Sequence, residues 1–294
     1  MEKISTINGK QKRISDRIWY VLIYASASVS IFLLVGIVGY VFYRGAGVIN
    51  WNFLTTVPST IKGNYGIAGN IVNTLYMIFL TLLIATPLGI GAAVYLNEYA
   101  KQGRIVRTIE ATTEILAGLP SIIFGLFGMV FFGNTLKLGY SILTGALTLT
   151  LMVLPLITRN TQEALKTVPD TYRSGALGMG APKWYMIRTI LLPSAMPGII
   201  TGVILAIGRI VGESAALLFT AGSGFLLPKL GEYGNGLFQK IFQPGGTLTI
   251  ELYLSMSKAK YQEAFGIAVV LLVIVFVINI ITKYLTKRFD VSAK

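Results

Sequence analysis

The sequence of 294 residues contains no cysteine and no histidine. The lack of cysteine excludes disulfides and thiolate metal sites. The lack of histidine removes the commonest metal ligand and the usual proton shuttle. Charged residues are also scarce, at 13% of the chain, whereas a soluble globular domain has about 25%. We therefore expect neither a metal site nor another cofactor, and the chain does not have the composition of a soluble domain.

Apolar residues are abundant instead. They make up 54% of the chain, and the mean hydropathy is +0.69. This composition is typical of an integral membrane protein. A formal net charge of +13 is also found in nucleic-acid-binding proteins, but helical membrane proteins concentrate Lys and Arg in their cytoplasmic loops. We expect the chain to lie in a lipid bilayer and to have no nucleic-acid partner.

Six apolar stretches are long enough to cross a bilayer as helices, which requires about 20 residues each. The sequence therefore predicts an all-α integral membrane protein with six transmembrane helices. A Leu-Pro-Ser step at 119–121 is expected to bend the third span, and only a short connection separates the third span from the fourth. The predicted spans are Ile18–Tyr43, Ile71–Leu96, Ile115–Leu136, Leu138–Thr158, Gly198–Phe219 and Ala264–Thr282.

Lysine and arginine are distributed unevenly between the two sides that these spans define. Most of the 25 lie in the N-terminal segment, in the connections after the second and fourth spans, and in the C-terminal tail. The positive-inside rule makes that side cytoplasmic. Both termini are therefore predicted to be cytoplasmic, which agrees with an even number of spans.

The spans divide the chain into three parts. Residues 1–70 comprise a cytoplasmic N-terminal segment, the first helix and an external loop. Residues 71–283 form a core of five transmembrane helices, and 284–294 are a cytoplasmic tail. Two long loops within the core, 161–193 in the cytoplasm and 222–263 outside, are long enough to have functions of their own.

Two charges lie four residues apart within the apolar stretch 198–227, namely Arg209 and Glu213. A charge at this depth is costly, and it usually faces a pathway or pairs with another charge. A spacing of four places both side chains on one face of a continuous helix. Arg209 suits a tetrahedral oxyanion because its guanidinium offers forked, permanently charged donors. We assign Arg209, Glu213 and Ser214 to a substrate path; a purely structural ion pair is the alternative.

The cytoplasmic loop contains a short segment of small residues that follows Pro169. Glycines at 175, 178 and 180 keep this segment slim, and Pro182 suits the first turn of a second helix. A helix of this kind fits a groove on a partner protein. An amphipathic helix lying on the lipid surface is the alternative, but such helices usually have a larger apolar face and more basic residues.

The same loop resembles the EAA loop of ABC importer permeases. That pattern is Glu-Ala-Ala, three residues, Gly, nine residues, Ile, any residue, and Leu-Pro. In this chain Gly180, Ile190, Leu192 and Pro193 fit the spacing. The sequence departs from the pattern at Ser174, where Glu is usual, and at Gly175, where Ala is usual.

Two further runs resemble the phosphate-specific permeases of this class. Residues 116–128, LAGLPSIIFGLFG, resemble their third helix, and residues 209–222, RIVGESAALLFTAG, resemble their fifth. The second run is more similar to PstA-type permeases than to their PstC-type partners. The resemblance extends from about residue 69 to residue 282.

This resemblance implies a type I ABC importer permease of MetI-like fold in the bacterial or archaeal cell (inner) membrane. The implied partners are a PstC-like permease, two copies of a PstB-like ATPase and an external phosphate-binding protein. Inorganic phosphate is the implied substrate. The family's EAA loop docks on the ATPase, so the implied coupling residues are Tyr172, Arg173, Ser174, Gly175, Ala176, Leu177, Gly178 and Gly180.

The sequence contains no phosphate-binding loop of the type Gly-x-x-x-x-Gly-Lys-Ser/Thr. The chain is therefore not expected to be an enzyme, and an ATPase in another subunit would supply the energy. A secondary transporter or channel driven by an ion gradient, with Glu213 as a proton site, is the alternative function. An intramembrane enzyme is disfavoured because the chain lacks His, Cys and paired carboxylates deep in a span. Glu98, Glu110 and Glu114 are expected to be solvated or to make interhelical contacts.

Overall fold

The computed structural model describes residues 14–58, 65–101, 103–228 and 236–289, and the side chains of 17–284 within those ranges. Those residues form helices and connections without any strand, which confirms the all-α prediction. The predicted cytoplasmic residues 1–13 and 290–294, and residues 229–235 of the predicted external loop, lie outside the described residues.

Within the described residues, five helices are long and apolar enough to cross a membrane, and a bent pair makes a sixth if it is counted as one span. The first, second, fourth and sixth predicted spans correspond to single helices of at least 25 residues. These helices are α1 (Ile14–Gly45), α3 (Ala68–Val94, continued by a π-helical turn over Tyr95–Tyr99), α6 (Ile142–Lys166) and α12 (Tyr261–Phe289).

The third predicted span is not one helix. The chain forms α4 (Arg104–Gly118) and α5 (Ser121–Gly128), and a π-helical turn extends α5 to Thr135. The two halves are bent by 100° at the break. Pro120 accounts for the break, because proline excludes the preceding residue from helical geometry and provides no N–H. The expected bend is therefore present, but it separates the two helices completely.

The fifth predicted span is also interrupted. Helix α8 (Lys183–Met186) continues through a π-helical turn into α9 (Leu192–Gly212), which ends before Glu213. A short helix, α10 (Ala215–Thr220), follows. The prediction of a continuous helix from Gly198 to Phe219 is therefore wrong, because the apolar run extends through a backbone break that hydropathy does not detect.

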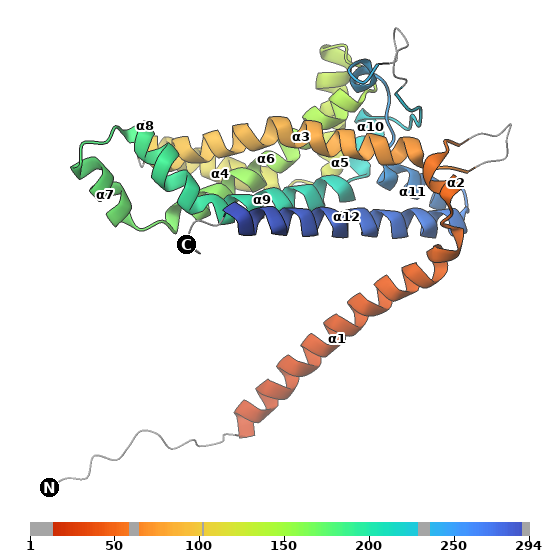
Figure 1. Cartoon of the computed structure of the whole chain (residues 1–294), viewed down its shortest axis with the longest axis horizontal. Coiled ribbons are helices and arrows are strands. Elements are labelled where there is room, and N and C mark those ends of the chain that lie inside the picture. The colour runs from red at the N-terminus through yellow and green to blue at the C-terminus, as the bar shows by residue number, and fades with distance from the viewer. Residues whose placement is uncertain (1–13, 59–64, 102, 229–235, 290–294) are drawn as a thin grey trace.

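The predicted external loop 222–263 has structure of its own. A 3₁₀ turn covers Gln239–Phe242, and a helix, α11 (Leu248–Ser257), precedes α12. The Thr247 side chain begins α11 by accepting a hydrogen bond from the Ile250 amide at 3.4 Å. At the other end of the bundle, the predicted cytoplasmic loop contains α7 (Asp170–Gly178). Figure 1 shows α7 and α11 at opposite ends of the bundle.

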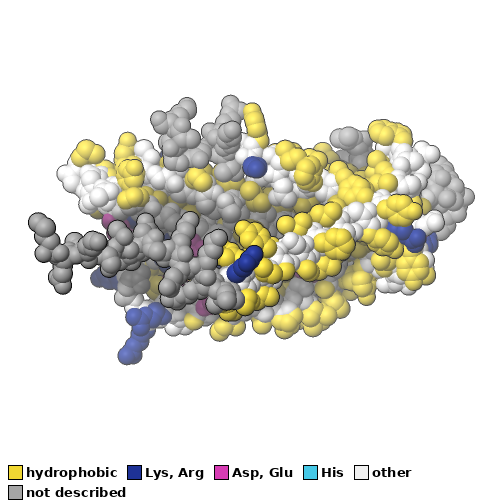
Figure 2. Space-filling view, turned by 90° about the horizontal axis from the view of Figure 1, so that it is seen from below, with side chains coloured by type: hydrophobic (Ala, Val, Ile, Leu, Met, Phe, Trp, Pro, Cys, Tyr) yellow, Lys and Arg dark blue, Asp and Glu magenta, His cyan; other side chains and the backbone are white. Residues whose placement is uncertain are grey.

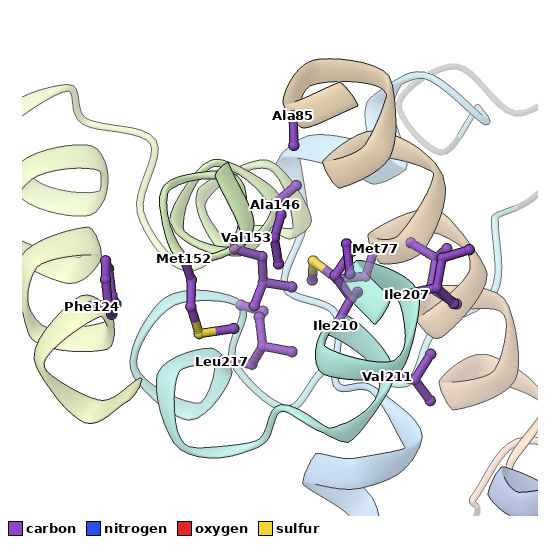
Figure 3. Close-up of a cluster of buried hydrophobic side chains, with 14 of the residues drawn as sticks. Met77, Ala85, Phe124, Ala146, Met152, Val153, Ile207, Ile210, Val211 and Leu217 are labelled. Atoms are coloured by element: carbon purple, nitrogen blue, oxygen red, sulfur yellow. The ribbon is translucent and has the colours of Figure 1, made fainter. Parts of the chain in front are cut away.

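The core lies where α3, α6, α9 and α10 meet. Helix α6 is central, because 67% of its most apolar window is buried, against 39% for α3 and 28% for α12. Figure 3 shows Met77 of α3, Val153 of α6, Ile210 of α9 and Leu217 of α10 pointing toward one another. This arrangement holds the end of α9, and therefore Arg209, against α6.

Helix α1 lies outside this bundle. It contacts α12 near its own C-terminal end, and Figure 1 shows it diverging from the other helices toward its N-terminus. None of its most apolar window is buried. Figure 2 shows hydrophobic side chains over much of the face that it views. An apolar surface of this extent belongs in lipid or against another membrane subunit.

Buried amides attach the segment before α11 to the first turns of α3. The Asn73 amide nitrogen donates to the carbonyl oxygens of Gly224 at 2.9 Å and Gly246 at 3.2 Å. The Asn70 amide also donates to the Gly246 carbonyl, at 3.1 Å. Both asparagines are fully buried. These bonds satisfy carbonyls of an irregular segment that has no helical partners of its own.

Two ionisable groups lie on this same end of the bundle. The Tyr65 hydroxyl donates to a Glu251 carboxylate oxygen at 2.7 Å, and burial raises the pKa of Tyr65. The tyrosine therefore remains a donor to α11 at neutral pH. The Lys240 ammonium is fully buried and donates to the Pro244 carbonyl at 3.5 Å, and burial lowers the pKa of Lys240.

Close packing of α5 against α10 generates a first prediction. A Cβ at Gly125 would lie 2.7 Å from the Cα of Ala216, a backbone atom that cannot move aside alone. Gly125→Ala should therefore lower the thermal midpoint of the detergent-solubilised protein, with an overpacking cost of about 1–3 kcal/mol. Gly91→Ala is the matched control, because a Cβ on this α3 glycine meets no atom within 4 Å. Equal midpoints for the two variants would contradict the packing.

Candidate functional site

Arg209 lies in the last turn of α9 and is half-buried. Its side chain borders a cavity of about 450 Å³ between α4, α6 and α9. In the parts of the chain that the structure describes, no hydrogen bond or ion pair engages its guanidinium. The other residues that line the cavity are Glu110, Thr113, Glu114, Ala117, Met152, Pro155, Leu156, Arg159, Gln162, Glu163 and Lys166.

The cavity is lined by equal numbers of acidic and basic side chains, but only some of them form ion pairs or hydrogen bonds with one another. The Arg159 guanidinium lies 3.3 Å from a carboxylate oxygen of Glu114 and 3.3 Å from one of Glu163. Gln162 donates to a Glu110 carboxylate oxygen at 3.4 Å. Because Arg159 occupies two of the three carboxylates, Arg209 keeps free donors. A cavity with an unengaged guanidinium can bind an anion.

The structure places Glu213 away from the expected position. Glu213 follows the end of α9 with an extended backbone (φ −81°, ψ 126°), and no ion pair joins it to Arg209 within 4.0 Å. Its carboxylate instead accepts a hydrogen bond from the Ala216 amide at 3.0 Å. The first amides of a helix lack backbone partners, so a carboxylate is stabilised there. The prediction that both charges share one helix face is therefore wrong.

A second contact holds the backbone at this break. The Thr249 hydroxyl of α11 donates to the Glu213 carbonyl at 2.9 Å. Ser214 occupies the position before α10, and its carbonyl accepts from the Leu218 amide at 3.0 Å. Glu213 and Ser214 do not line the cavity beside Arg209. Their assignment to a substrate path stays a prediction.

The predicted coupling residues fall on α7 and the turn that follows it. Tyr172, Ser174, Gly175, Leu177, Gly178 and Gly180 are exposed. Ala176 is buried at 3% exposure, within an apolar cluster that includes Leu165 and Ile187. Arg173 turns inward, toward Glu98 at the end of α3. The helix therefore has one attached face and one free face.

Gly180 ends this helix in a geometry that requires glycine. Its φ is +81°, in the left-handed region that residues with a Cβ rarely adopt. The Gly180 amide donates to the Leu177 carbonyl and the Ala181 amide donates to the Ala176 carbonyl, both at 3.0 Å. This pair of bonds is the Schellman motif.

Sequence reasoning missed most of the cavity around Arg209. Arg159, Gln162, Glu163 and Lys166 lie at spacings of three, four and seven residues, which places them on one face of α6. That spacing was a usable signal. Nothing in the sequence, however, indicates that this face lies opposite the end of α9.

Similarities to known proteins agree with this architecture. A family model described as "Binding-protein-dependent transport system inner membrane component" matches residues 85–291. The chain belongs to this family. It is thus a multi-pass inner-membrane permease of an ABC importer, and membership implies a second permease, an ATPase and a substrate-binding protein as partners.

Two relatives illustrate the sequence similarity. The probable ABC transporter permease protein YqgI of Bacillus subtilis (strain 168) is 36% identical over 283 residues, which cover 93% of this permease and 96% of that protein. The phosphate transport system permease protein PstA of Xylella fastidiosa (strain Temecula1 / ATCC 700964) is 35% identical over 237 residues, covering 79% and 78%. The relative named PstA confirms the expected resemblance to PstA-type permeases.

Solved structures support the fold. A chain of a bacterial alginate ABC transporter superposes with a TM-score of 0.66 at 16% identity, covering 94% of this permease and 96% of that chain. A chain of the inward-facing MetNI methionine ABC transporter gives 0.57 at 20% identity, covering 76% and 94%. At these identities the likeness concerns the fold alone, and it confirms the expected MetI-like permease fold.

The Schellman motif generates a second prediction. Gly180→Val should destabilise the end of α7 by about 1–2 kcal/mol, because a residue with a Cβ pays that cost in the left-handed region. Gly180→Asn should be milder, since Asn tolerates this conformation. Limited proteolysis of the loop around 178–182 in the purified permease would measure the difference. Equal cleavage rates for the two variants would show that the left-handed geometry does not matter.

Proposed function

We propose that this chain is the PstA-like transmembrane subunit of an ATP-driven importer of inorganic phosphate. The observation on which the proposal depends is the unengaged guanidinium of Arg209 in a charged cavity between α4, α6 and α9. Phosphate suits this group because its oxygens accept the paired donors of an arginine. The similarity to proteins named phosphate transport system permease protein PstA supports the substrate.

The other charges of the cavity suit phosphate in particular. Arg159 and Lys166 add positive charge beside Arg209, while Glu110 and Glu163 offer acceptors. A partly protonated phosphate can donate a proton to a carboxylate, but a fully ionised tetrahedral anion has no proton to donate and is repelled. We therefore propose that these carboxylates favour phosphate over such an anion.

The proposed assembly contains a PstC-like permease, two PstB-like ATPases and an external phosphate-binding protein. The α7 end of the bundle is the cytoplasmic end, and the exposed face of α7 meets the ATPase there. The α11 end faces the binding protein. ATP-driven closure of the ATPases would move α7 and thereby change access to the cavity beside Arg209. The permease itself breaks and makes no covalent bond.

An ion-gradient-driven secondary transporter for an anionic solute is the alternative. It would need a titratable group free to exchange protons on the path. Glu213 was the sequence candidate for that group, and its carboxylate is engaged by the amide of Ala216 at 3.0 Å. The geometry therefore gives this alternative no specific support.

The proposed function predicts how the assembled complex behaves in liposomes. Phosphate uptake by the co-purified complex should require both ATP on the ATPase side and the binding protein on the other side. Radiolabelled phosphate accumulation, with and without ATP, is the measurement. Uptake that ignores ATP and follows an imposed pH or sodium gradient would replace this proposal with the alternative.

A fourth prediction concerns Arg209 itself. Arg209→Gln removes the charge and one fork of donors, so phosphate uptake should fall about ten- to hundred-fold, the equivalent of about 1.5–3 kcal/mol for hydrogen bonds to a charged group. The ATPase should still co-purify with the variant, because Arg209 has no partner within the described chain whose loss would unfold it. Arg107→Gln, an exposed arginine on α4 outside the cavity lining, is the control. Loss of assembly in Arg209→Gln alone would indicate a structural role instead.

A further inference from the structure

The π-helical turn Tyr95–Tyr99, which continues α3, contains a buried carboxylate that the proposed transport path does not use. The Glu98 side chain is only 5% exposed, although it lies at the end of the bundle. One of its oxygens accepts hydrogen bonds from Arg173 Nη2 at 3.0 Å, Arg173 Nε at 3.3 Å and Asn97 Nδ2 at 2.8 Å. One Glu98 oxygen therefore receives both Arg173 nitrogens, and the carboxylate is ion-paired with the helix that would dock on the ATPase.

Arg173 uses all of its donors at this junction. Besides Glu98, its guanidinium donates to the carbonyls of Leu165 and Val168, both at 2.9 Å, and to the Asp170 carboxylate at 2.9 Å. An arginine has five N–H groups, and these contacts engage each of them. The guanidinium thus joins three segments, namely the end of α6, the start of α7 and the end of α3.

The segment on the other side of α7 attaches to the same turn. The Lys183 ammonium, at the start of α8, donates to the backbone carbonyl of Glu98. It also lies over the ring of Tyr99, 4.9 Å from the ring centroid. Arg173 of α7 and Lys183 of the segment after α7 are therefore attached to the same π-helical turn, Tyr95–Tyr99.

The attachment point continues directly from α3, which packs on the central helix α6. Helix α3 packs closely along α6, and a Cβ at Gly89 would lie 2.7 Å from the Ile157 side chain. A displacement passed along α3 from this π-helical turn would therefore also act on α6. Helix α6 contributes Arg159 and Lys166 to the cavity beside Arg209.

A buried ion pair is an inefficient way to stabilise a fold. Removing two charges from water costs several kcal/mol, and well-packed apolar residues of similar size often do as well. Two guanidinium nitrogens that converge on one carboxylate oxygen, while other donors of the same arginine bind backbone carbonyls, do however fix the distance and orientation between the joined segments. A contact that transmits a displacement needs that property.

We propose that Glu98 and Arg173 form the link through which a movement of α7 is transmitted to α3 and α6. Both are positioning residues, since neither lies in the cavity beside Arg209. The inference rests on the proposed function, because it presumes that α7 receives the movement from an ATPase. It predicts that breaking the pair uncouples ATP hydrolysis from transport without detaching the ATPase.

The experiment measures phosphate taken up per ATP hydrolysed by the complete complex in liposomes, for Glu98→Gln, Arg173→Gln and the double variant. Each single variant should retain ATP hydrolysis, while the phosphate taken up per ATP hydrolysed should fall about five-fold or more. A fall of this size is within the range found for residues that couple distant sites. The double variant should be no worse than the poorer single variant, because the two residues act as one unit. Arg107→Gln is the control, since this exposed arginine lies on α4, outside both α7 and the cavity lining, and its ratio should stay within about two-fold.

Several outcomes would overturn the inference. A Glu98→Gln ratio equal to that of the unmodified complex would show that the pair transmits nothing. Failure of the ATPase to co-purify with either single variant would show that the pair builds the docking surface instead. If the unmodified complex transports phosphate with ATP and the variants remain coupled, only this inference fails. If the unmodified complex shows no ATP-dependent uptake, the proposed function fails with it.

Discussion

A peptide group inside a bilayer finds no water to bond with, and this constraint determines where the helices of the permease can break. The break at Glu213 is tolerated because its carboxylate accepts from the Ala216 amide and its carbonyl accepts from Thr249. Thr249 belongs to α11 and lies 36 residues after Glu213, so the interrupted fifth span depends on a helix formed much later in the chain. That helix depends in turn on Asn70 and Asn73, which satisfy the carbonyls of the segment before it. The position of Arg209 at the end of α9 is a consequence of the same set of bonds.

The arrangement of spans could be predicted from hydropathy where the helices are continuous. Four of the six predicted spans correspond to single helices. A helix satisfies all of its backbone hydrogen bonds within one segment, so a long apolar segment in lipid becomes a helix. The two failures have a common cause. Pro120 and Glu213 interrupt runs that remain apolar on both sides. The Leu-Pro-Ser step predicted a bend at Pro120, but a sum over residue types indicates neither the size of that bend nor the break at Glu213. Helix α11 is the opposite case, a helix within a segment predicted to be a loop. It was missed because the residues around it are rich in glycine, which is typical of loops.

The candidate site was predictable only in part. Arg209 could be identified because an arginine within an apolar run is rarely without a function. Its pairing with Glu213 followed from helical spacing, and that inference failed when the helix proved to end at Gly212. Glu114, Arg159 and Glu163 join Arg209 through the packing of α4, α6 and α9, which no local pattern specifies. Gly180, in contrast, could be predicted from the sequence alone. Its role depends only on the backbone of one turn, and the spacing of the EAA pattern identifies its position.

The permease uses the same residue types in two different electrostatic environments. The side chains of Arg159, Glu114 and Glu163 are 60–70% exposed, and ion pairs of this kind contribute about 0–1 kcal/mol. Such pairs can open and reform when an anion competes for the arginine. The Arg173–Glu98 pair is 18% and 5% exposed, and an unpaired charge left there would be strongly destabilising. Exposure therefore separates an exchangeable set of charges beside Arg209 from a fixed set at the base of α7. Under the proposed function both sets are needed, because the cavity beside Arg209 must release its anion while the attachment of α7 to the bundle must hold.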